Sequence, residues 1–305
     1  MMISRPMKAM QEPITDEQLK LLPYPVIGSP KLDGFWACCG NGQVWASSMM
    51  LIPNLFVRKE LSDPALHGLV GELIVGAPNA GGGPDGTFHN TSGPIRRSAG
   101  QPNFTFYVFD NFNGPNLPYS HRWVNINPTM LERSHIKILE YAILNTPLGV
   151  IEYEHMCVAQ GYEGAMIRTF SGMYKQGRTT LAEMNMFKRK PFEEQEGTII
   201  GFEEQMQNNN IATVSNTGRT KRSKHAENLV PKGTLGAFII EDKKNWKEPF
   251  RCSGSTADFN QEVWNHRSEW VGGKVKYKFQ RYGSINKPRQ AVFIDARPGW
   301  DVTSF

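Results

Sequence analysis

Short apolar stretches that favour β-strands recur along the whole chain, and they constrain its fold more than any other feature. In the first part they lie at residues 43–46, 71–75, 104–109 and 165–167. Helical periodicity is present at residues 130–144 and again at residues 151–160, where the pattern ends near Gly161. Strands interspersed with a few helices predict an α+β fold with antiparallel sheets.

The pattern changes after the basic stretch at residues 187–191. Further strands are expected, with one helix near residues 259–270, and they lie at residues 198–202, 233–241, 274–279 and 291–296. About five strands in roughly a hundred residues suit a small barrel such as an OB fold. We therefore predict two domains, residues 1–192 and 193–305, with the boundary near residues 191–194.

A polar, Asn-rich and basic segment interrupts the second domain at about residues 207–232. It lies between two predicted barrel strands and contains few apolar side chains that could be buried. We therefore expect an insertion without ordered structure.

Composition excludes several classes of protein. The mean hydropathy of −0.44 is typical of a water-soluble chain, and no apolar run approaches the ~20 residues of a membrane span. The first ten residues lack the apolar core of a signal peptide. The four cysteines form no Cys-x-x-Cys pair, which argues against a zinc ribbon and suits a reducing compartment. These observations predict a cytoplasmic protein that has no membrane partner.

The charge distribution permits a polyanionic partner. The formal net charge is +5, and basic side chains gather at residues 219–225 and 274–289. Each run is equally compatible with a solvated surface. The second run carries Tyr277, Phe279 and Tyr282 between its cations, a combination that also fits a nucleic-acid groove.

Lys31 is a candidate covalent nucleophile in the sequence Ser-Pro-Lys-Leu-Asp-Gly at residues 29–34. An amine attacks phosphorus only when it is unprotonated, and an ordinary lysine has a pKa near ~10.4. A reactive site must therefore lower that pKa with cations, a metal or desolvation. Taken alone, so short a motif is more simply interpreted as a surface strand that ends in an Asp-Gly turn.

Further chemistry-bearing residues follow at the ends of predicted strands. Glu72 and Glu163 each precede an apolar stretch, and Phe109 ends another. Lys188 and Lys190 alternate along a strand and so share one face. Each residue alone fits a solvated strand end or a core position. Together they supply a nucleophile, carboxylates for a metal and a ribose, an aromatic for a base and cations for phosphate, which nucleotidyl transfer requires.

The order of these motifs resembles the nucleotidyltransferase motifs of ATP-dependent DNA ligases, especially the small viral and phage enzymes. The resemblance covers nearly the whole chain, and its further segments are residues 174–181, 196–200, 220–225 and 287–297. It implies a nucleotidyltransferase (adenylation) domain with antiparallel sheets, followed by an OB-fold β-barrel. It also implies that the insertion at about residues 207–232 is a latch for duplex DNA.

The resemblance assigns roles in adenylation. Lys31 would form a phosphoramide with AMP, and Asp33 would support the lysine pocket. Glu72 would contact the ribose and Phe109 would stack on adenine. Glu163 would bind the divalent metal, Mg²⁺ or Mn²⁺. ATP is the implied cofactor, and AMP the group carried covalently.

The resemblance also assigns the remaining basic residues. Lys188 and Lys190 would hold the α-phosphate. Arg289 and Arg297 would act when the OB domain closes over ATP and would orient the pyrophosphate. The basic residues that would contact DNA are Lys175, Arg178, Arg219, Lys221, Arg222 and Lys224.

The implied function is the sealing of nicks in duplex DNA through three in-line displacements. Lysyl-AMP forms first, AMP then moves to the DNA 5′-phosphate, and the 3′-hydroxyl finally attacks that phosphate and releases AMP. The implied partner is nicked duplex DNA, on which a monomer closes as a clamp. For a phage or viral chain the compartment would be the host cytosol.

Two other classes of function remain open. An RNA ligase or a GTP-using capping-type nucleotidyltransferase shares the Lys-x-Asp-Gly core. A nick-binding protein with impaired sealing is the second, because Trp36, Ser48 and Leu51 stand where the family has basic residues that grip the nick phosphate and the ribose. Arg96 and Arg97 are cations that would compensate.

Overall fold

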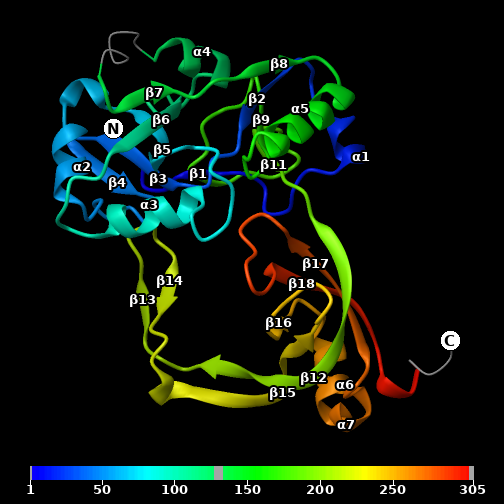
Figure 1. Ribbon diagram of the computed structural model, residues 1–305. Helices are drawn as coiled ribbons and strands as arrows, with labels where there is room; N and C mark the ends of the chain where they lie inside the picture. Colours follow the sequence, from blue (N-terminus) through cyan, green and yellow to red (C-terminus); the bar gives the residue numbers. More distant parts are fainter. Residues whose placement is uncertain (1, 127–132, 302–305) are drawn as a thin grey trace. The chain divides into compact units, whose positions relative to one another are not determined.

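The computed structural model describes residues 2–126 and 133–301 of the chain. The chain divides into two compact units (Figure 1). The first comprises Met1–Lys190 with Ser215–Arg219, and the second comprises Pro191–Val214 with Thr220–Phe305. Within the described residues, none of the helices combines the length and apolar character required to cross a bilayer.

The first unit contains a five-stranded sheet of order β4-β3-β5-β6-β7, antiparallel except between β6 and β7. Its strands are β3 (Phe35–Gly40), β4 (Gln43–Ala46), β5 (Leu69–Val75), β6 (Phe104–Asn111) and β7 (Ile136–Ile138). Alternate residues of a strand share a face, and Phe104, Phe106 and Val108 of β6 are all buried. They form one core with Leu73 of β5.

A four-stranded antiparallel sheet of order β11-β9-β2-β8 completes the main framework of the first unit. Its strands are β2 (Val26–Pro30), β8 (Ala142–Leu144), β9 (Ala165–Thr169) and β11 (Met186–Arg189). Every residue of β2 is buried. Helix α5 (Pro147–Ala159) packs on this sheet through Val150 and Cys157. The Thr146 hydroxyl caps the helix by accepting a hydrogen bond from the Gly149 amide at 3.0 Å.

The remaining elements of the first unit are short. The strands β1 (Met7–Lys8) and β10 (Gly177–Arg178) form a parallel pair. The helices are α1 (Asp16–Leu19), α2 (Leu55–Glu60), η1 (Pro64–Leu66), α3 (Thr87–Arg96) and α4 (Tyr119–Val124).

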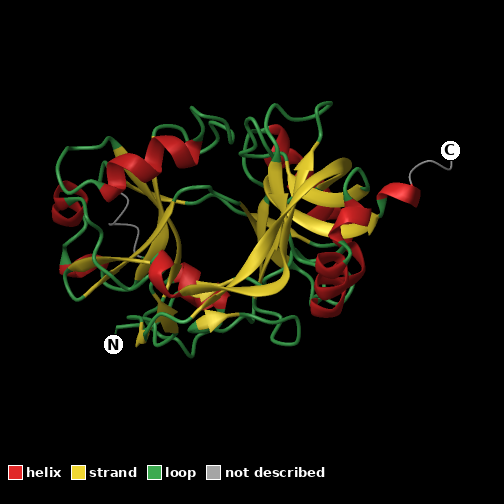
Figure 2. Cartoon of the chain, turned by 90° about the horizontal axis from the view of Figure 1, so that it is seen from below, coloured by secondary structure: helices red, strands yellow, loops and turns green. Residues whose placement is uncertain are grey.

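The second unit is built on a five-stranded antiparallel sheet of order β16-β15-β12-β17-β18, whose long strands are strongly twisted (Figure 2). Its elements are β12 (Glu193–Asn208), β15 (Leu229–Glu241), β16 (Phe250–Cys252), α6 (Ala257–Asn265), α7 (Arg267–Trp270), β17 (Lys274–Gln280), β18 (Arg289–Arg297) and η4 (Gly299–Asp301). The two edge strands approach each other, because the Phe293 amide donates to the Ser253 carbonyl at 2.9 Å. The sheet thus curls around a core that includes Phe238, Tyr277 and Phe279.

The sequence-based predictions of strands and of the fold class are confirmed. Each predicted strand lies within an observed one, and the fold is α+β with antiparallel sheets. The predicted helix at residues 151–160 corresponds to α5, and the predicted helix at residues 259–270 is divided into α6 and α7.

The helix predicted at residues 130–144 is wrong. Residues 130–132 lie outside the described residues, and the rest of the segment contains β7 and β8. Ile136 of β7 pairs with Phe106, and Ile143 of β8 pairs with Ile27. β-branched residues of this kind fit the edge of a sheet, so tertiary pairing overrides a local helical spacing.

The insertion has regular structure where none was expected. The strands β12 and β15 stay paired as far as Asn208 and Leu229, and beyond them lie β13 (Ala212–Val214), β14 (Thr220–Arg222) and η3 (Ala226–Asn228). The Asn210 side chain donates to the carbonyls of Ser223 and His225, each at 3.0 Å. Hydrogen bonds therefore replace the apolar contacts that this segment lacks.

Candidate active site

The backbone brings Lys31 and Glu163 side by side. Lys31 follows β2 directly, and its amide donates to the Gly164 carbonyl at 2.8 Å. The Glu163 amide donates back to the Lys31 carbonyl at 3.3 Å, so the ladder between β2 and β9 continues past both strands. Gly164 has φ +150°, and a Cβ there would lie 2.1 Å from the Arg189 carbonyl oxygen. Only glycine permits this close approach.

The Lys31 side chain forms an ion pair with Glu163. The ammonium contacts Oε2 of Glu163, and Lys190 lies on the other side, with its Nζ 3.7 Å from Oε1. The Glu163 side chain is only 4% exposed and that of Lys31 is 21% exposed. The predicted nucleophile, the predicted metal ligand and one predicted phosphate ligand therefore share one buried cluster.

The carboxylates around Lys31 control its pKa. Burial disfavours the ammonium, but the attraction of Glu163, Glu72 and Asp33 outweighs burial and raises the pKa of Lys31 above its ordinary value. The chemistry led us to expect a lowered pKa, so the direction in this structure is the opposite. The reason is that Glu163 is bound to the lysine itself, and lowering the pKa requires another partner for this carboxylate.

Glu72 has an environment unlike that of Glu163. It lies on β5 opposite Trp36 of β3. Burial raises the pKa of Glu72 to about 8, although the nearby Lys31 ammonium acts in the opposite direction. At neutral pH this side chain is therefore mostly a neutral carboxylic acid, which can both donate and accept a hydrogen bond.

A cavity of about 260 Å³ lies next to this cluster within the first unit, and Glu163 and Lys190 are not among its lining residues. Lys31, Glu72, Phe109 and Lys188 line it, together with apolar side chains that include Leu139. Phe109 and Leu139 offer flat and apolar surfaces, whereas the lysines supply positive charge. The cavity thus combines surfaces that suit an aromatic base with cations that suit a phosphate.

Arg168, whose role the sequence did not reveal, also lines this cavity. Its guanidinium lies 5.5 Å from the centre of the Phe109 ring and forms an ion pair with Asp110 at 2.8 Å. Asp110 also binds Arg122 at 2.9 Å, and all three charged side chains are buried. The sequence places Asp110 directly after Phe109, but only the fold shows that this acid joins two arginines.

Most of the other predicted residues are not among those that line the cavity. Arg289 and Arg297 are on β18 of the second unit, where Arg297 pairs with Glu196 at 3.0 Å. Lys175 pairs with Glu183. Asp33 is buried next to the lysine cluster. Arg178, in contrast, does line the cavity.

The basic residues predicted to bind DNA in the insertion form an exposed group. Lys221, Arg222 and Lys224 line a hollow of about 880 Å³ on the second unit, and all three side chains are exposed. Arg219 belongs to the short segment that is grouped with the first unit.

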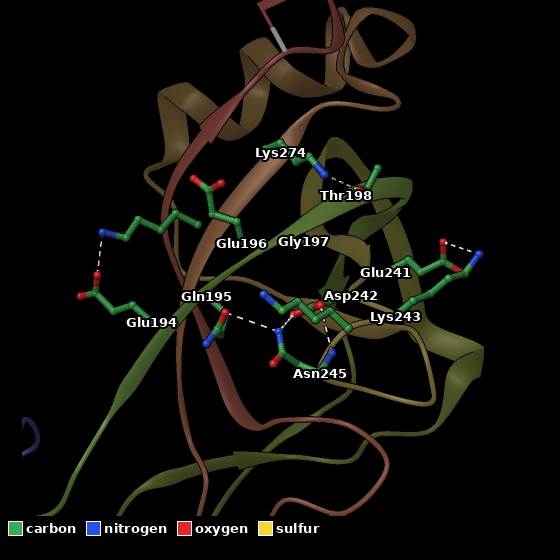
Figure 3. Close-up of a pocket in the computed structure, with 12 residues that line it drawn as sticks. Glu194, Gln195, Glu196, Gly197, Thr198, Glu241, Asp242, Lys243, Asn245 and Lys274 are labelled. Carbon is green, nitrogen blue, oxygen red and sulfur yellow. Dashed lines mark hydrogen bonds and ion pairs between the residues drawn. The ribbon is translucent and has the colours of Figure 1, made fainter. Parts of the chain in front are cut away.

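A second hollow, of about 620 Å³, lies on the sheet of the second unit (Figure 3). Its charges are largely balanced within the protein: Lys243 pairs with Glu241 at 3.3 Å, and Lys276 pairs with Glu194 at 2.6 Å. The buried Asp242 accepts from Asn245 at 2.8 Å. We therefore do not assign polyanion binding to this hollow. Among the described residues, no group of three or more His, Cys, Asp or Glu is arranged to hold a metal ion.

The fold and the site define a class of protein: two α+β units, the first of which holds a partly buried lysine beside a cavity suited to a nucleotide. Similar solved structures specify the class further. The DNA ligase-adenylate of Chlorella virus is 25% identical, with a TM-score of 0.53 over 97% of this chain and 99% of that chain. A Lig E DNA ligase is 18% identical, with a TM-score of 0.70 over 97% and 100%. This chain has the fold of the small ATP-dependent DNA ligases, a nucleotidyltransferase unit followed by an OB-fold unit.

Comparison with protein-family models gives no match. Comparison with curated protein sequences gives none either.

Proposed function

We propose that this protein is an ATP-dependent DNA ligase that seals nicks in duplex DNA through a lysyl-AMP intermediate. The observation that carries the proposal is the position of Lys31, paired with Glu163 at a cavity that Glu72, Phe109 and Lys188 also line. The chain is similar to the Chlorella virus DNA ligase-adenylate over 97% of its length, and this similarity supports adenylation of the lysine as the reaction at the cavity.

In the first step the Lys31 nitrogen attacks the α-phosphate of ATP and pyrophosphate leaves. Phe109 stacks on the adenine, and the neutral Glu72 exchanges hydrogen bonds with the ribose. Lys188 and Lys190 neutralise the charge that develops on the α-phosphate. The cavity residues thus act by positioning and electrostatics, as phosphoryl-type transfers require.

Glu163 fits a divalent metal. It is a buried carboxylate in contact with the reacting lysine, and Mg²⁺ is commonly held by one or two carboxylates together with substrate phosphates. When bound, Mg²⁺ or Mn²⁺ would neutralise charge on the phosphate oxygens. A Glu163 carboxylate engaged in this way would no longer accept a hydrogen bond from Lys31, and burial would then lower the pKa of Lys31.

The later steps transfer AMP to the 5′-phosphate of the nick and join it to the 3′-hydroxyl. We infer that Lys221, Arg222 and Lys224 bind the duplex backbone and that the protein acts as a monomer that closes on DNA. Arg289 and Arg297 of β18 belong to the first step, where they are the proposed ligands for the departing pyrophosphate.

The four cysteines are unpaired and buried, which agrees with a cytoplasmic protein.

One observation favours a second function, nick binding with impaired sealing. Trp36 lines the cavity with an indole that cannot make the bidentate phosphate contact of an arginine.

The test uses the purified chain with ATP labelled at the α-phosphate and with a nicked duplex. We expect a covalent adduct that resists alkali but is cleaved by acid, as a phosphoramide is, and a sealed strand in the presence of Mg²⁺. Lys31→Ala abolishes both, whereas Lys20→Ala, which alters an exposed lysine, leaves both unchanged. An adduct formed only from GTP contradicts the proposal and indicates a capping-type enzyme. An adduct without sealing of DNA indicates the nick-binding function, and sealing of RNA alone indicates an RNA ligase.

A further inference from the structure

A pair of cations lies at the edge of the cavity, on two strands that are far apart in the sequence. Lys8 of β1 is directly opposite Arg178 of β10 in a parallel ladder. Residues opposite each other in a ladder project from the same face, so the two positive side chains are neighbours. Both line the cavity that also contains Lys31 and Lys188.

The backbone at this position is firmly held. The buried Thr179 donates to the Lys8 carbonyl from its amide at 2.8 Å, and its hydroxyl donates to the Met186 carbonyl at 2.8 Å. Arg178 donates to the Ala9 carbonyl at 3.0 Å. Among the described residues, no carboxylate forms an ion pair with the Lys8 ammonium. The two like charges, both exposed to solvent, therefore lie on neighbouring positions without an acid between them, an arrangement that favours an anionic ligand.

The charges around the cavity do not balance. Lys31 is paired with Glu163, and Arg168 is paired with Asp110. Glu72, whose pKa is raised to about 8 by burial, contributes little negative charge at neutral pH.

Lys8 and Arg178 remain as cations of this cavity that form no ion pair with a carboxylate of the described residues, whereas Lys188 is attracted by Glu12 and Glu163. Burial lowers the pKa of Lys8, and Arg219 and Arg178 lower it further. The pKa of Lys188 is lowered by burial and by Lys31 and Arg178. A phosphoramide of AMP carries only one negative charge, so the cavity has the capacity for a second anion.

We propose that Lys8, together with Arg178, binds a second phosphate group beside the one attached to Lys31, and that this group is the 5′-phosphate of the nick. The inference rests on the proposed ligase function and adds Lys8 to the residues that recognise the DNA substrate. In this step a 5′-phosphate oxygen bonds to the AMP phosphorus while the bond from phosphorus to the Lys31 nitrogen breaks. The nitrogen leaves with the electron pair and takes a proton from water. Such an in-line transfer needs the acceptor phosphate next to Lys31.

The β- and γ-phosphates of ATP share this chemistry, so the experiment separates the two sources. Lys8→Met, which keeps the length of the side chain, is compared with Lys8→Arg and with the exposed control Lys20→Met. For each protein three rates are measured: lysyl-AMP formation from labelled ATP, AMP transfer from preformed lysyl-AMP to a nick, and sealing of a pre-adenylated nick. The affinity of each lysyl-AMP protein for nicks with a 5′-phosphate and a 5′-hydroxyl is measured as well.

We expect Lys8→Met to form lysyl-AMP within about twofold of the parent rate and to slow AMP transfer on the order of 10- to 100-fold, the effect of one charge-assisted hydrogen bond. The variant also loses the preference for a 5′-phosphate nick, a ratio that is independent of the fraction of folded protein. Lys8→Arg restores most of the rate of AMP transfer and most of the preference for a 5′-phosphate nick.

A loss confined to lysyl-AMP formation overturns the inference, because the second phosphate then belongs to ATP. Unchanged transfer with an unchanged phosphate preference overturns it as well. The parent protein tests the function separately: if it forms no lysyl-AMP, the ligase proposal itself fails, and the inference fails with it.

Discussion

The Lys31 ammonium is paired with the Glu163 carboxylate, and this pair fixes the protonation state of the proposed nucleophile. With Glu163 as its partner, Lys31 has a raised pKa and is charged at neutral pH. Adenylation therefore requires that Glu163 be drawn away from the lysine, the role we propose for the divalent metal. The same carboxylate would thus keep the lysine inactive in the free protein and help to activate it with ATP.

Glu163→Gln should lower the pKa of Lys31, because it removes the main attraction that opposes burial. The measurement is the pH dependence of Lys31 acetylation by a small reagent, followed by mass spectrometry of the peptide that contains it. The exposed Lys20 serves as the internal control. We expect the midpoint for Lys31 to lie above that of Lys20 in the parent and to fall in the variant. An unchanged midpoint would show that Glu163 does not govern the proton on Lys31.

Glu72 should make the fold less stable as the pH rises. Its pKa in the folded protein is about 8, raised by burial from its ordinary value of 4.5, so between these pH values the folded state binds more protons than the unfolded state. Stability contributed by the neutral acid is complete below about pH 4.5 and is lost as the pH rises through 8.

Glu72→Gln removes this dependence. We expect the free energy of unfolding of the variant, relative to the parent, to increase by on the order of 1–3 kcal/mol between pH 4.5 and pH 9. Urea unfolding at the two pH values measures the difference. A parallel pH dependence of the two proteins would contradict the raised pKa.

Strand β2 illustrates what the sequence alone does not reveal. Gly28 and Pro30 count against a central strand, yet β2 lies between β8 and β9. A Cβ at Gly28 would lie 2.6 Å from Leu144 Cδ1, so the glycine permits close packing that has no local signal. Pro30 is the last residue of the strand. Proline has no amide hydrogen to donate, and at the end of a strand the missing hydrogen bond disrupts the ladder least.

The sequence predicts those residues of the candidate site that stand in recognisable motifs. Lys31, Glu163 and Lys190 each stand in a recognisable motif, and the structure brings them together. Lys8 and Arg168 have no such signal, since their surroundings depend on pairing with Arg178 and Asp110. The pKa of Lys31 was likewise unpredictable, because its direction is set by which carboxylate it contacts.

Asp110 should be essential for the stability of the first unit. It lies between Arg122 and Arg168, and removing it leaves two buried guanidinium groups without an anion. We expect Asp110→Ala to destabilise the protein by about 3–5 kcal/mol in denaturant unfolding. Glu17→Ala, which breaks an exposed pair with Lys20, should cost far less. Equal effects of the two changes would contradict the importance of the buried cluster.

The exposed cations of the insertion should determine how strongly DNA binding depends on salt. Replacing Lys221, Arg222 and Lys224 by alanine removes up to three phosphate contacts. The slope of log K against log salt should then fall by up to roughly 0.9 for each lost contact, while lysyl-AMP formation remains unchanged.

The matched control is the triple alanine variant of Lys243, Lys244 and Lys247, which removes the same charge from another part of the second unit. Fluorescence anisotropy of a labelled nicked duplex over a range of salt concentrations measures both slopes. If the slope of log K against log salt falls equally in the two triple variants, net charge rather than the insertion determines the affinity for DNA. If the slope falls only in the insertion variant, the phosphate backbone is bound at Lys221, Arg222 and Lys224.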